Sequence, residues 1–130
     1  MKRETLTQVH NRNKPVNDYA PDRKFYQSRR WRTFRAKLLK DQFEADLREI
    51  IEMHSQGHGK WTYDQFQMFI NSQRPYCRAS FLNGELRPAD VLDHITAIRS
   101  GGNPFDTNNL QWLTHQQHNA KRQAEGRANG

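Results

Sequence analysis

Apolar residues recur every three or four positions through the first half of the chain, which is the period of an amphipathic helix. The series consists of Trp31, Phe34, Leu38, Leu39, Phe43, Leu47, Ile50 and Ile51. Ser28 is a residue type that caps helix N-termini, and Gly57 or Gly59 can end the helix. The pattern therefore predicts one long helix between Ser28 and these glycines.

A second helix is predicted from Tyr63 to about Ser72. Thr62 and Gln65 have the spacing of a capping box, and Pro75 cannot continue a helix. Residues 81–86 are expected to form a turn, in which Asn83-Gly84 favours a hairpin.

Short elements follow toward the C-terminus. Strands are expected at 89–95 and 110–113, separated by a loop at 99–106. Thr114 and Gln117 form another capping box, which opens a final helix to about Ala124. The order predicts an α+β fold, a mainly helical single domain that ends in a strand–strand–helix unit.

The first 22 residues show no sustained period and contain Pro15 and Pro21, so we expect an extended or poorly ordered arm. Residues 1–24 are interpreted as a basic flexible arm. Residues 25–130 are interpreted as one domain, with a helical part at 25–74 and the strand–strand–helix unit at 75–125.

Charge supports an anionic partner. The chain has 130 residues, a net charge of +7 and a pI near 9.9. Residues 1–40 carry a net +9, residues 41–73 carry −4 and residues 74–130 carry +2. Nucleic acid is the commonest soluble anionic partner, although solubility alone is an alternative reading of the charge.

The cysteine content and the hydropathy indicate the cellular compartment. Cys77 is the single cysteine, which excludes an internal disulfide and a zinc site built from cysteines. No apolar run is long enough for a membrane span, and the N-terminus has no apolar segment of a secretory signal. We expect a reducing, cytoplasmic setting without membrane association.

Four residues near the C-terminus carry the candidate chemistry: Asp93, His94, Asn109 and His118. A carboxylate and an imidazole together suit one divalent metal, and a second imidazole suits a general base. Neighbouring residues in a strand point to opposite faces, so Asp93 or His94 must lie at a strand end or bulge for both to serve one site.

These residues lie in segments that resemble the HNH endonuclease family, with its ββα-metal (His-Me finger) site. The segments are Asp93-His94-Ile95, Gly101-Gly102, Asn109-Leu110-Gln111-Trp112-Leu113 and His118-Asn119-Ala120-Lys121. Fourteen residues separate His94 from Asn109 and eight separate Asn109 from His118, which fits the family. Residues 25–35 also resemble the leader of phage-type and prophage-type members.

The resemblance implies a role for each residue. His94 would be the general base, Asp93 and His118 the protein ligands of the metal, and Asn109 the group that orients His94. It also implies a C-terminal ββα-metal finger that hydrolyses DNA and leaves 5′-phosphate and 3′-hydroxyl ends. Mg²⁺ or Mn²⁺ is the expected ion, and a histidine ligand also admits Zn²⁺ or Ni²⁺.

The chain departs from relatives that hold a structural zinc with two Cys-x-x-Cys pairs. Cys77 stands at the start of the first pair, but Ser80, Thr114 and Gln117 occupy the other three positions. We therefore expect no structural zinc and a finger held by packing. The candidates for that packing are Trp31, Phe81, Leu92, Ile98, Phe105, Trp112 and Leu113, with the acidic helical segment between Lys40 and Gln73 as a scaffold.

The basic residues around the first helix and after His118 are candidates for DNA contacts: Arg29, Arg30, Arg32, Arg35, Lys121 and Arg122. An ordinary solvated face is the alternative. His115 is interpreted as an exposed residue at the helix start, with a metal-ligand or phosphate contact as the alternative. A metal site formed by His54 and His58 is disfavoured, because Gly57 lies between them near the helix end.

The predicted function is thus a metal-dependent HNH endonuclease of low sequence specificity, in a phage or prophage setting that could include a terminase. A site-specific restriction or homing nuclease is one alternative. A DNA-binding module that has lost catalysis is the other.

Overall fold

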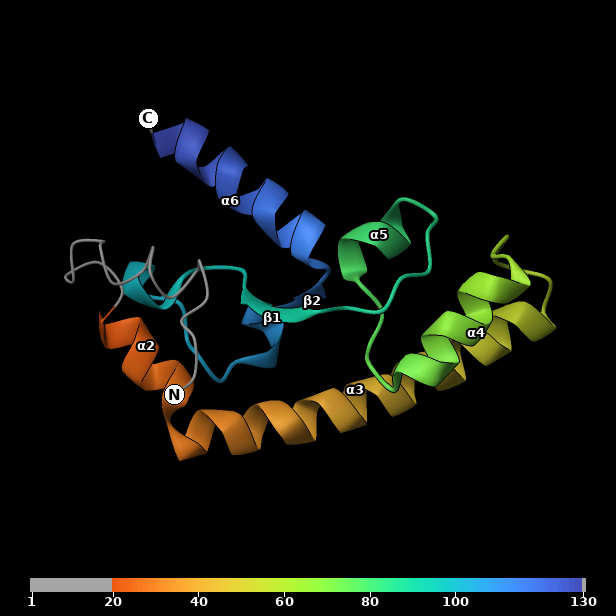
Figure 1. Ribbon diagram of the computed structural model, residues 1–130, viewed down its shortest axis with the longest axis horizontal. Coiled ribbons are helices and arrows are strands. Elements are labelled where there is room, and N and C mark those ends of the chain that lie inside the picture. The colour runs from red at the N-terminus through yellow and green to blue at the C-terminus, as the bar shows by residue number, and fades with distance from the viewer. Residues whose placement is uncertain (1–19, 130) are drawn as a thin grey trace, which may run out of the picture. The chain divides into compact units, whose positions relative to one another are not determined.

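The computed structural model describes residues 20–129, which are mostly helical (Figure 1). Its elements are α2 (Ala20–Gln27), α3 (Arg29–Ser55), α4 (Tyr63–Ser72), α5 (Arg78–Leu82), β1 (Val91–His94), β2 (Leu110–Leu113) and α6 (His115–Asn129), with 3₁₀ turns η1 (Ile98–Ser100) and η2 (Thr107–Asn109). The predicted class, mainly helical α+β with a C-terminal strand–strand–helix unit, is confirmed. Among these helices none has the length and apolar character required to cross a bilayer.

The chain divides into two compact units, Met1–Arg32 and Thr33–Gly130. In the described part of the first unit, α2 leads into the start of α3. The Ser28 hydroxyl accepts from the Trp31 amide at 3.2 Å, which confirms Ser28 as a helix cap. The Trp31 ring is buried and lies 5.1 Å from the Phe25 ring and 5.6 Å from the Tyr26 ring.

Helix α2 corrects one expectation. An extended arm was predicted to residue 22 and a flexible arm to residue 24, but the chain is helical from Ala20. Pro21 is compatible with this because it lies in the first turn, where a backbone N–H would have no helical acceptor. The rest of the predicted arm, residues 1–19, lies outside the described residues, and the domain boundary at residue 24 stays a prediction.

In the second unit, α3 and α4 pack through an apolar cluster. Phe43 and Ile50 from α3 meet Phe69 from α4 and Leu86 from the segment after α5, and all four are buried. The Phe43 and Phe69 rings lie 5.5 Å apart. Helix α4 begins with the predicted capping box of Thr62 and Gln65. It ends at Gln73, which adopts a left-handed conformation (φ 55°), before Pro75.

A buried carboxylate fastens α3 to the chain after α4. Asp46 accepts from the Tyr76 amide at 3.0 Å and from Gln42 Nε2 at 2.7 Å. The Tyr76 hydroxyl donates to Glu49 at 3.0 Å, so one turn of α3 holds both the backbone and the side chain of Tyr76. The acidic segment therefore acts as a scaffold for the residues that lead into the C-terminal unit.

The expected hairpin at Asn83-Gly84 is wrong. Residues 78–82 form α5, and Gly84 (φ 85°) ends it, with the Glu85 amide donating to the Ser80 carbonyl at 2.9 Å. An Asn-Gly pair suits a helix end as well as a hairpin turn because both need positive φ. The flanking segments pair through an isolated bridge between Tyr76 and Pro88, and no strand is formed there among the described residues.

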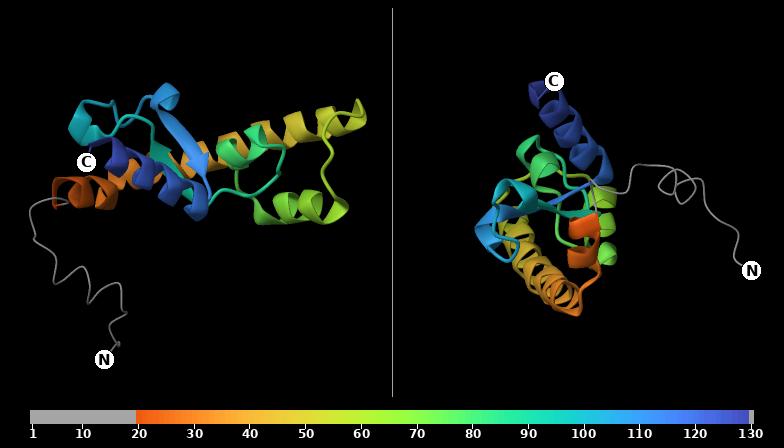
Figure 2. Two further views of the ribbon diagram at one scale, coloured as in Figure 1. Left: turned by 90° about the horizontal axis from the view of Figure 1, so that it is seen from above. Right: turned by 90° about the vertical axis from the view of Figure 1, so that its left-hand side faces the viewer.

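The strand–strand–helix part of the second unit consists of the antiparallel pair β1–β2 followed by α6. Helix α6 leaves the end of β2 and contacts both strands (Figures 1 and 2). Strand β2 matches its predicted bounds. Strand β1 is shorter than predicted because the Ala89 amide donates to Pro75 instead of to β2. The predicted loop at 99–106 includes part of η1, and α6 extends five residues beyond Ala124.

Candidate active site

Strand register and helix capping position the predicted catalytic residues. Asp93 lies opposite Gln111 and His94 lies opposite Leu110, so His94 is the last residue of β1. Helix α6 begins two residues after the end of β2. Its first turn is held by the Thr114 hydroxyl, which accepts from the Gln117 amide at 3.2 Å, and by Asp90, which accepts from the His115 amide at 3.0 Å.

Asp93 and His118 come together across the strand–helix junction. Asp93 Oδ1 lies 3.4 Å from His118 Nε2, and the two side chains are 7% and 28% exposed. Metal–ligand bonds of about 2.0–2.2 Å place neighbouring donors roughly 3.0–3.5 Å apart. An oxygen and a nitrogen at this separation fit a divalent ion. In the described part of the chain, no cluster of three or more His, Cys, Asp or Glu has a metal-holding arrangement.

Lys121 reaches the same carboxylate from the next turn of α6. Its ammonium nitrogen lies 2.9 Å from Asp93 Oδ2, 3.0 Å from the His94 carbonyl oxygen and 3.1 Å from Glu125 Oε1. Burial lowers the pKa of Lys121, but the hydrogen bonds and charges of Asp93 and Glu125 outweigh it and leave the pKa raised. Lys121 is therefore a cation at neutral pH, directed into the site.

The His94 ring is buried and contacts the loop that follows β1. Its Nε2 lies 3.1 Å from the Pro104 carbonyl oxygen. A carbonyl only accepts, so this contact assigns the proton to Nε2 and the lone pair of the neutral ring to Nδ1. His94 is 5% exposed and lies at the strand end, the position required for it and Asp93 to serve one site.

Asn109 fixes that loop through three hydrogen bonds to its backbone. Its Nδ2 donates to the carbonyls of Thr96 at 3.0 Å and Asn103 at 3.2 Å, and its Oδ1 accepts from the Thr96 amide at 2.8 Å. Gly102 packs against this cluster so closely that a Cβ there would lie 2.0 Å from the Thr96 carbonyl oxygen. The Gly101-Gly102 pair thus lets the loop close over Asn109, next to the carbonyl that contacts His94.

Cys77, Ser80 and Thr114, three of the four positions considered for zinc-binding cysteines, lie close together. Cys77 Sγ lies 3.2 Å from the Ser80 hydroxyl and 4.0 Å from the Thr114 hydroxyl. Thr114 in turn accepts from the Gln117 amide. Hydrogen bonds therefore join α5 to the start of α6 at these positions. Trp112 and Leu113 are buried. The ring centres of Phe105 and Phe34 lie 5.1 Å apart, which adds apolar packing around the strand–strand–helix part.

The predicted DNA contacts fall into different environments. Arg29, Arg30 and Arg32 are exposed in the first unit, and Arg122 is exposed on α6. Arg35 is half-buried, with its guanidinium 5.2 Å from the centre of the Trp112 ring. Lys121 is directed toward Asp93, as described above. The assignment of these six residues to DNA stays a prediction.

The other histidines among residues 20–129 have ordinary surroundings. His115 is exposed at the start of α6, as expected from its position. The His54 ring lies 5.5 Å from the Phe66 ring, and His58 is exposed beyond the end of α3.

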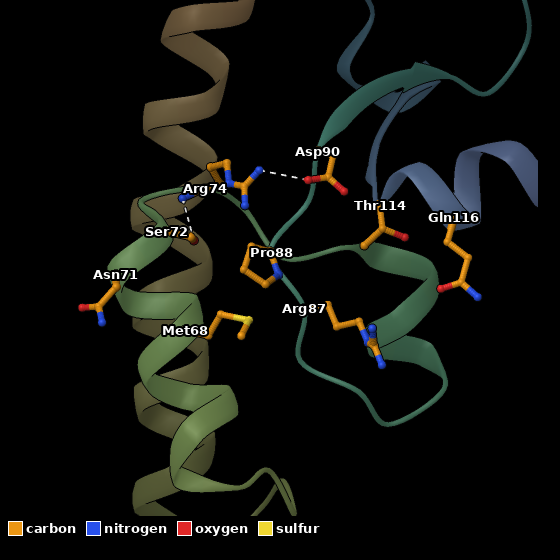
Figure 3. A pocket seen from close by; sticks show the side chains of 9 residues that line it. All are labelled: Met68, Asn71, Ser72, Arg74, Arg87, Pro88, Asp90, Thr114 and Gln116. Carbon is orange, nitrogen blue, oxygen red and sulfur yellow. Dashed lines mark hydrogen bonds and ion pairs between the residues drawn. The ribbon is translucent and has the colours of Figure 1, made fainter.

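An open groove of about 740 Å³ lies between the end of α4, residues 87–90 and the start of α6 (Figure 3). Arg74 and Asp90 pair across it at 3.0 Å, and Arg87 pairs with Glu85 at 2.7 Å. Because Asp90 also caps α6, the groove wall links α4 to the strand–helix junction. No local sequence pattern indicates this link, since its residues are remote from one another in the chain.

Gln111 is a site residue that the sequence analysis did not single out. Its Nε2 donates to Asp93 Oδ2 at 3.0 Å. The pairing of β1 with β2 could have identified it, because the residue opposite Asp93 in the ladder shares its face.

No family model matches the chain, and no curated protein matches it. The chain is similar to the crystal structure of the HNH endonuclease of the deep-sea thermophilic bacteriophage GVE2 with manganese ion, at 21% identity and a TM-score of 0.47. The similarity covers 98% of this chain and 100% of that one.

Proposed function

We propose that the chain is a metal-dependent endonuclease that hydrolyses DNA phosphodiester bonds at the junction of β1, β2 and α6. The observation that carries the proposal is the pair Asp93 Oδ1 and His118 Nε2, 3.4 Å apart, with His94 adjacent in sequence to Asp93. A metal-ligand pair beside an imidazole base is the minimum set for activating water against a phosphodiester.

Asp93 and His118 would hold the ion. A bound divalent metal would supply charge neutralisation at the phosphate and stabilise the leaving oxygen. The carboxylate oxygen favours Mg²⁺ or Mn²⁺, and the histidine nitrogen also admits Zn²⁺ or Ni²⁺. Two protein ligands leave several positions for water and phosphate oxygens, as hydrolysis requires.

His94 would accept the proton of the attacking water at Nδ1. Its contact with the Pro104 carbonyl supports this role because it places the ring proton on Nε2. Asn109 would orient His94 indirectly, by holding the loop that leads to Pro104. This differs in detail from a direct contact between the amide and the imidazole, and it serves the same purpose.

DNA would be held mainly through phosphates. Arg29, Arg30 and Arg32 are exposed in a segment with a large excess of positive charge, and Arg122 is exposed one turn after His118. Contacts of this kind carry little sequence information, which supports low sequence specificity.

The experiment compares wild type with His94→Ala, Asp93→Ala and His58→Ala on supercoiled plasmid, with Mg²⁺ and with Mn²⁺. His94→Ala should lose at least about 100-fold in nicking rate, the usual contribution of general-base catalysis, and should still bind DNA in a gel-shift assay. Asp93→Ala should lose nicking together with metal binding. His58→Ala, the same substitution at an exposed histidine, should cut as wild type does.

Retained nicking in His94→Ala would remove His94 as the base. A wild-type protein that binds plasmid but cuts it with neither metal would instead support a DNA-binding module without catalysis. Linear product that appears before nicked circles are consumed would indicate coordinated cleavage of both strands.

A further inference from the structure

The two oxygens of Asp93 have different partners. Oδ1 faces His118 Nε2 at 3.4 Å, whereas Oδ2 receives Gln111 Nε2 at 3.0 Å and Lys121 Nζ at 2.9 Å. The carboxylate is buried, so these neighbours determine its orientation. Rotation of the carboxylate would break two hydrogen bonds on the Oδ2 side.

Gln111 approaches from the sheet. It lies directly opposite Asp93 in the β1–β2 ladder, where side chains of one pair share a face. Its amide is neutral, so its effect on Asp93 is geometric. The strand pairing therefore sets the position of the donor without changing the charge of the site.

Lys121 approaches from α6, three residues after His118 and on the same helical face. An ammonium has three N–H donors, and three acceptors surround this one: Asp93 Oδ2, the His94 carbonyl and Glu125 Oε1. Two of these acceptors lie in β1. The side chain thus ties the end of β1, which carries both Asp93 and His94, to the helix that carries His118.

We propose that Gln111 and Lys121 are positioning residues that hold Oδ2 of Asp93 and so direct Oδ1 toward His118 and the metal between them. We call this pair the Asp93 clamp. The inference rests on the proposed function, since it concerns the same metal site. It gives Lys121 a role distinct from the phosphate contact expected from the sequence.

The positive charge of Lys121 allows positioning to be distinguished from a simple electrostatic effect on metal binding. A cation beside a metal site repels the metal, so electrostatics alone predicts that removing the Lys121 charge tightens metal binding. Loss of orientation predicts the opposite, since removing the groups that orient a metal ligand weakens affinity by about 10-fold to 100-fold. The sign of the change therefore separates positioning from simple charge.

The experiment measures Mn²⁺ binding by calorimetry on the full chain without DNA, for wild type, Asp93→Ala, Gln111→Leu and Lys121→Met. Lys60→Met is the control for loss of one exposed positive charge, and Gln116→Leu is the control for loss of an exposed amide. Thermal unfolding without metal shows whether each variant is folded. We expect about 10-fold to 100-fold weaker binding in Gln111→Leu and Lys121→Met, and wild-type affinity in both controls.

Wild-type or tighter affinity in the folded clamp variants, with binding lost in Asp93→Ala, overturns the clamp and leaves the metal site intact. If Asp93→Ala itself binds Mn²⁺ as wild type does, the metal site and the proposed function fail together. Should Lys121→Met not fold, Gln111→Leu decides the question, because it removes one neutral donor and retains the tie between β1 and α6.

Discussion

The thiol of Cys77 lies 4.0 Å from the hydroxyl of Thr114, although the two residues are 37 positions apart in the chain. Ser80 approaches the same sulfur at 3.2 Å, and the Gln117 amide donates to Thr114. A weak polar network therefore occupies the place where α5 meets the start of α6.

Introducing cysteines at Ser80, Thr114 and Gln117 should create a zinc site together with Cys77. In a tetrahedral zinc site with Zn–S bonds of about 2.3 Å, the sulfur atoms lie roughly 3.8 Å apart, close to the separations found here. The variant Ser80→Cys, Thr114→Cys, Gln117→Cys should bind one Zn²⁺ through these residues and Cys77. Free zinc at 100 times its Kd should raise the free energy of unfolding by about 2.7 kcal/mol.

Urea unfolding with zinc and with a chelator measures this effect. Thr114→Cys alone is the control and should show no zinc dependence. Equal stability of the triple variant with zinc and with chelator would contradict the convergence of these four positions.

Gly102→Ala should damage the site more than Gly101→Ala. Gly101 has φ 92° and open space around it, so alanine there adds only backbone strain, about 1 kcal/mol. A Cβ at Gly102 would instead displace the Thr96 carbonyl and the Asn109 amide, which lies 2.8 Å away. We expect Gly102→Ala to lose plasmid nicking severely, and Gly101→Ala to lose stability with little change in nicking below its melting temperature.

Paired nicking assays and urea melts of the two variants make the comparison. Equal nicking rates in folded Gly101→Ala and Gly102→Ala would show that the position of the 96–103 loop does not matter for catalysis.

Asp46 should make the protein less stable as pH rises from about 4 to about 6. Burial raises the pKa of this carboxyl to about 6, against the hydrogen bonds from Gln42 and the Tyr76 amide that lower it. Below about pH 4 the group is protonated in both states. Above that pH the unfolded chain releases its proton first, which lowers the free energy of the unfolded state relative to the folded one. The loss of stability is complete once the pH is well above 6, where the carboxyl is ionised in both states.

Asp46→Asn removes this titration and should flatten the pH dependence over that window. The free energy of unfolding at pH values on either side of it, measured by urea for both proteins, gives the comparison. Parallel curves for wild type and Asp46→Asn would assign the pH dependence to other groups.

Arg29 and Arg30 should contribute to the salt dependence of DNA binding. Each phosphate neutralised adds about 0.9 to the slope of log K against log salt on B-DNA. Changing both arginines to alanine should therefore reduce the slope by about 2. Arg48→Ala, an exposed arginine in the acidic part of α3, is the control. An unchanged slope in the double variant would return Arg29 and Arg30 to an ordinary solvated face.

Local patterns predicted most of the elements. The caps at Ser28 and Thr62 and the bounds of α4 and β2 match the structure, because each depends on residues within one or two turns of the chain. Asn83-Gly84 was misread because its positive-φ preference fits a helix end and a hairpin equally well. Only the helical conformation of residues 78–82 decides between them.

By itself the sequence determined which chemical groups are available and in what order: Asp93 and His94 adjacent, then Asn109, then His118. Tertiary structure decided which of them meet. The β1–β2 register brings Gln111 to Asp93, and the packing of α6 on the strands brings His118 and Lys121 to the same carboxylate. Residue types are local properties of the chain, whereas these contacts depend on strand pairing and helix packing between segments that are distant in sequence.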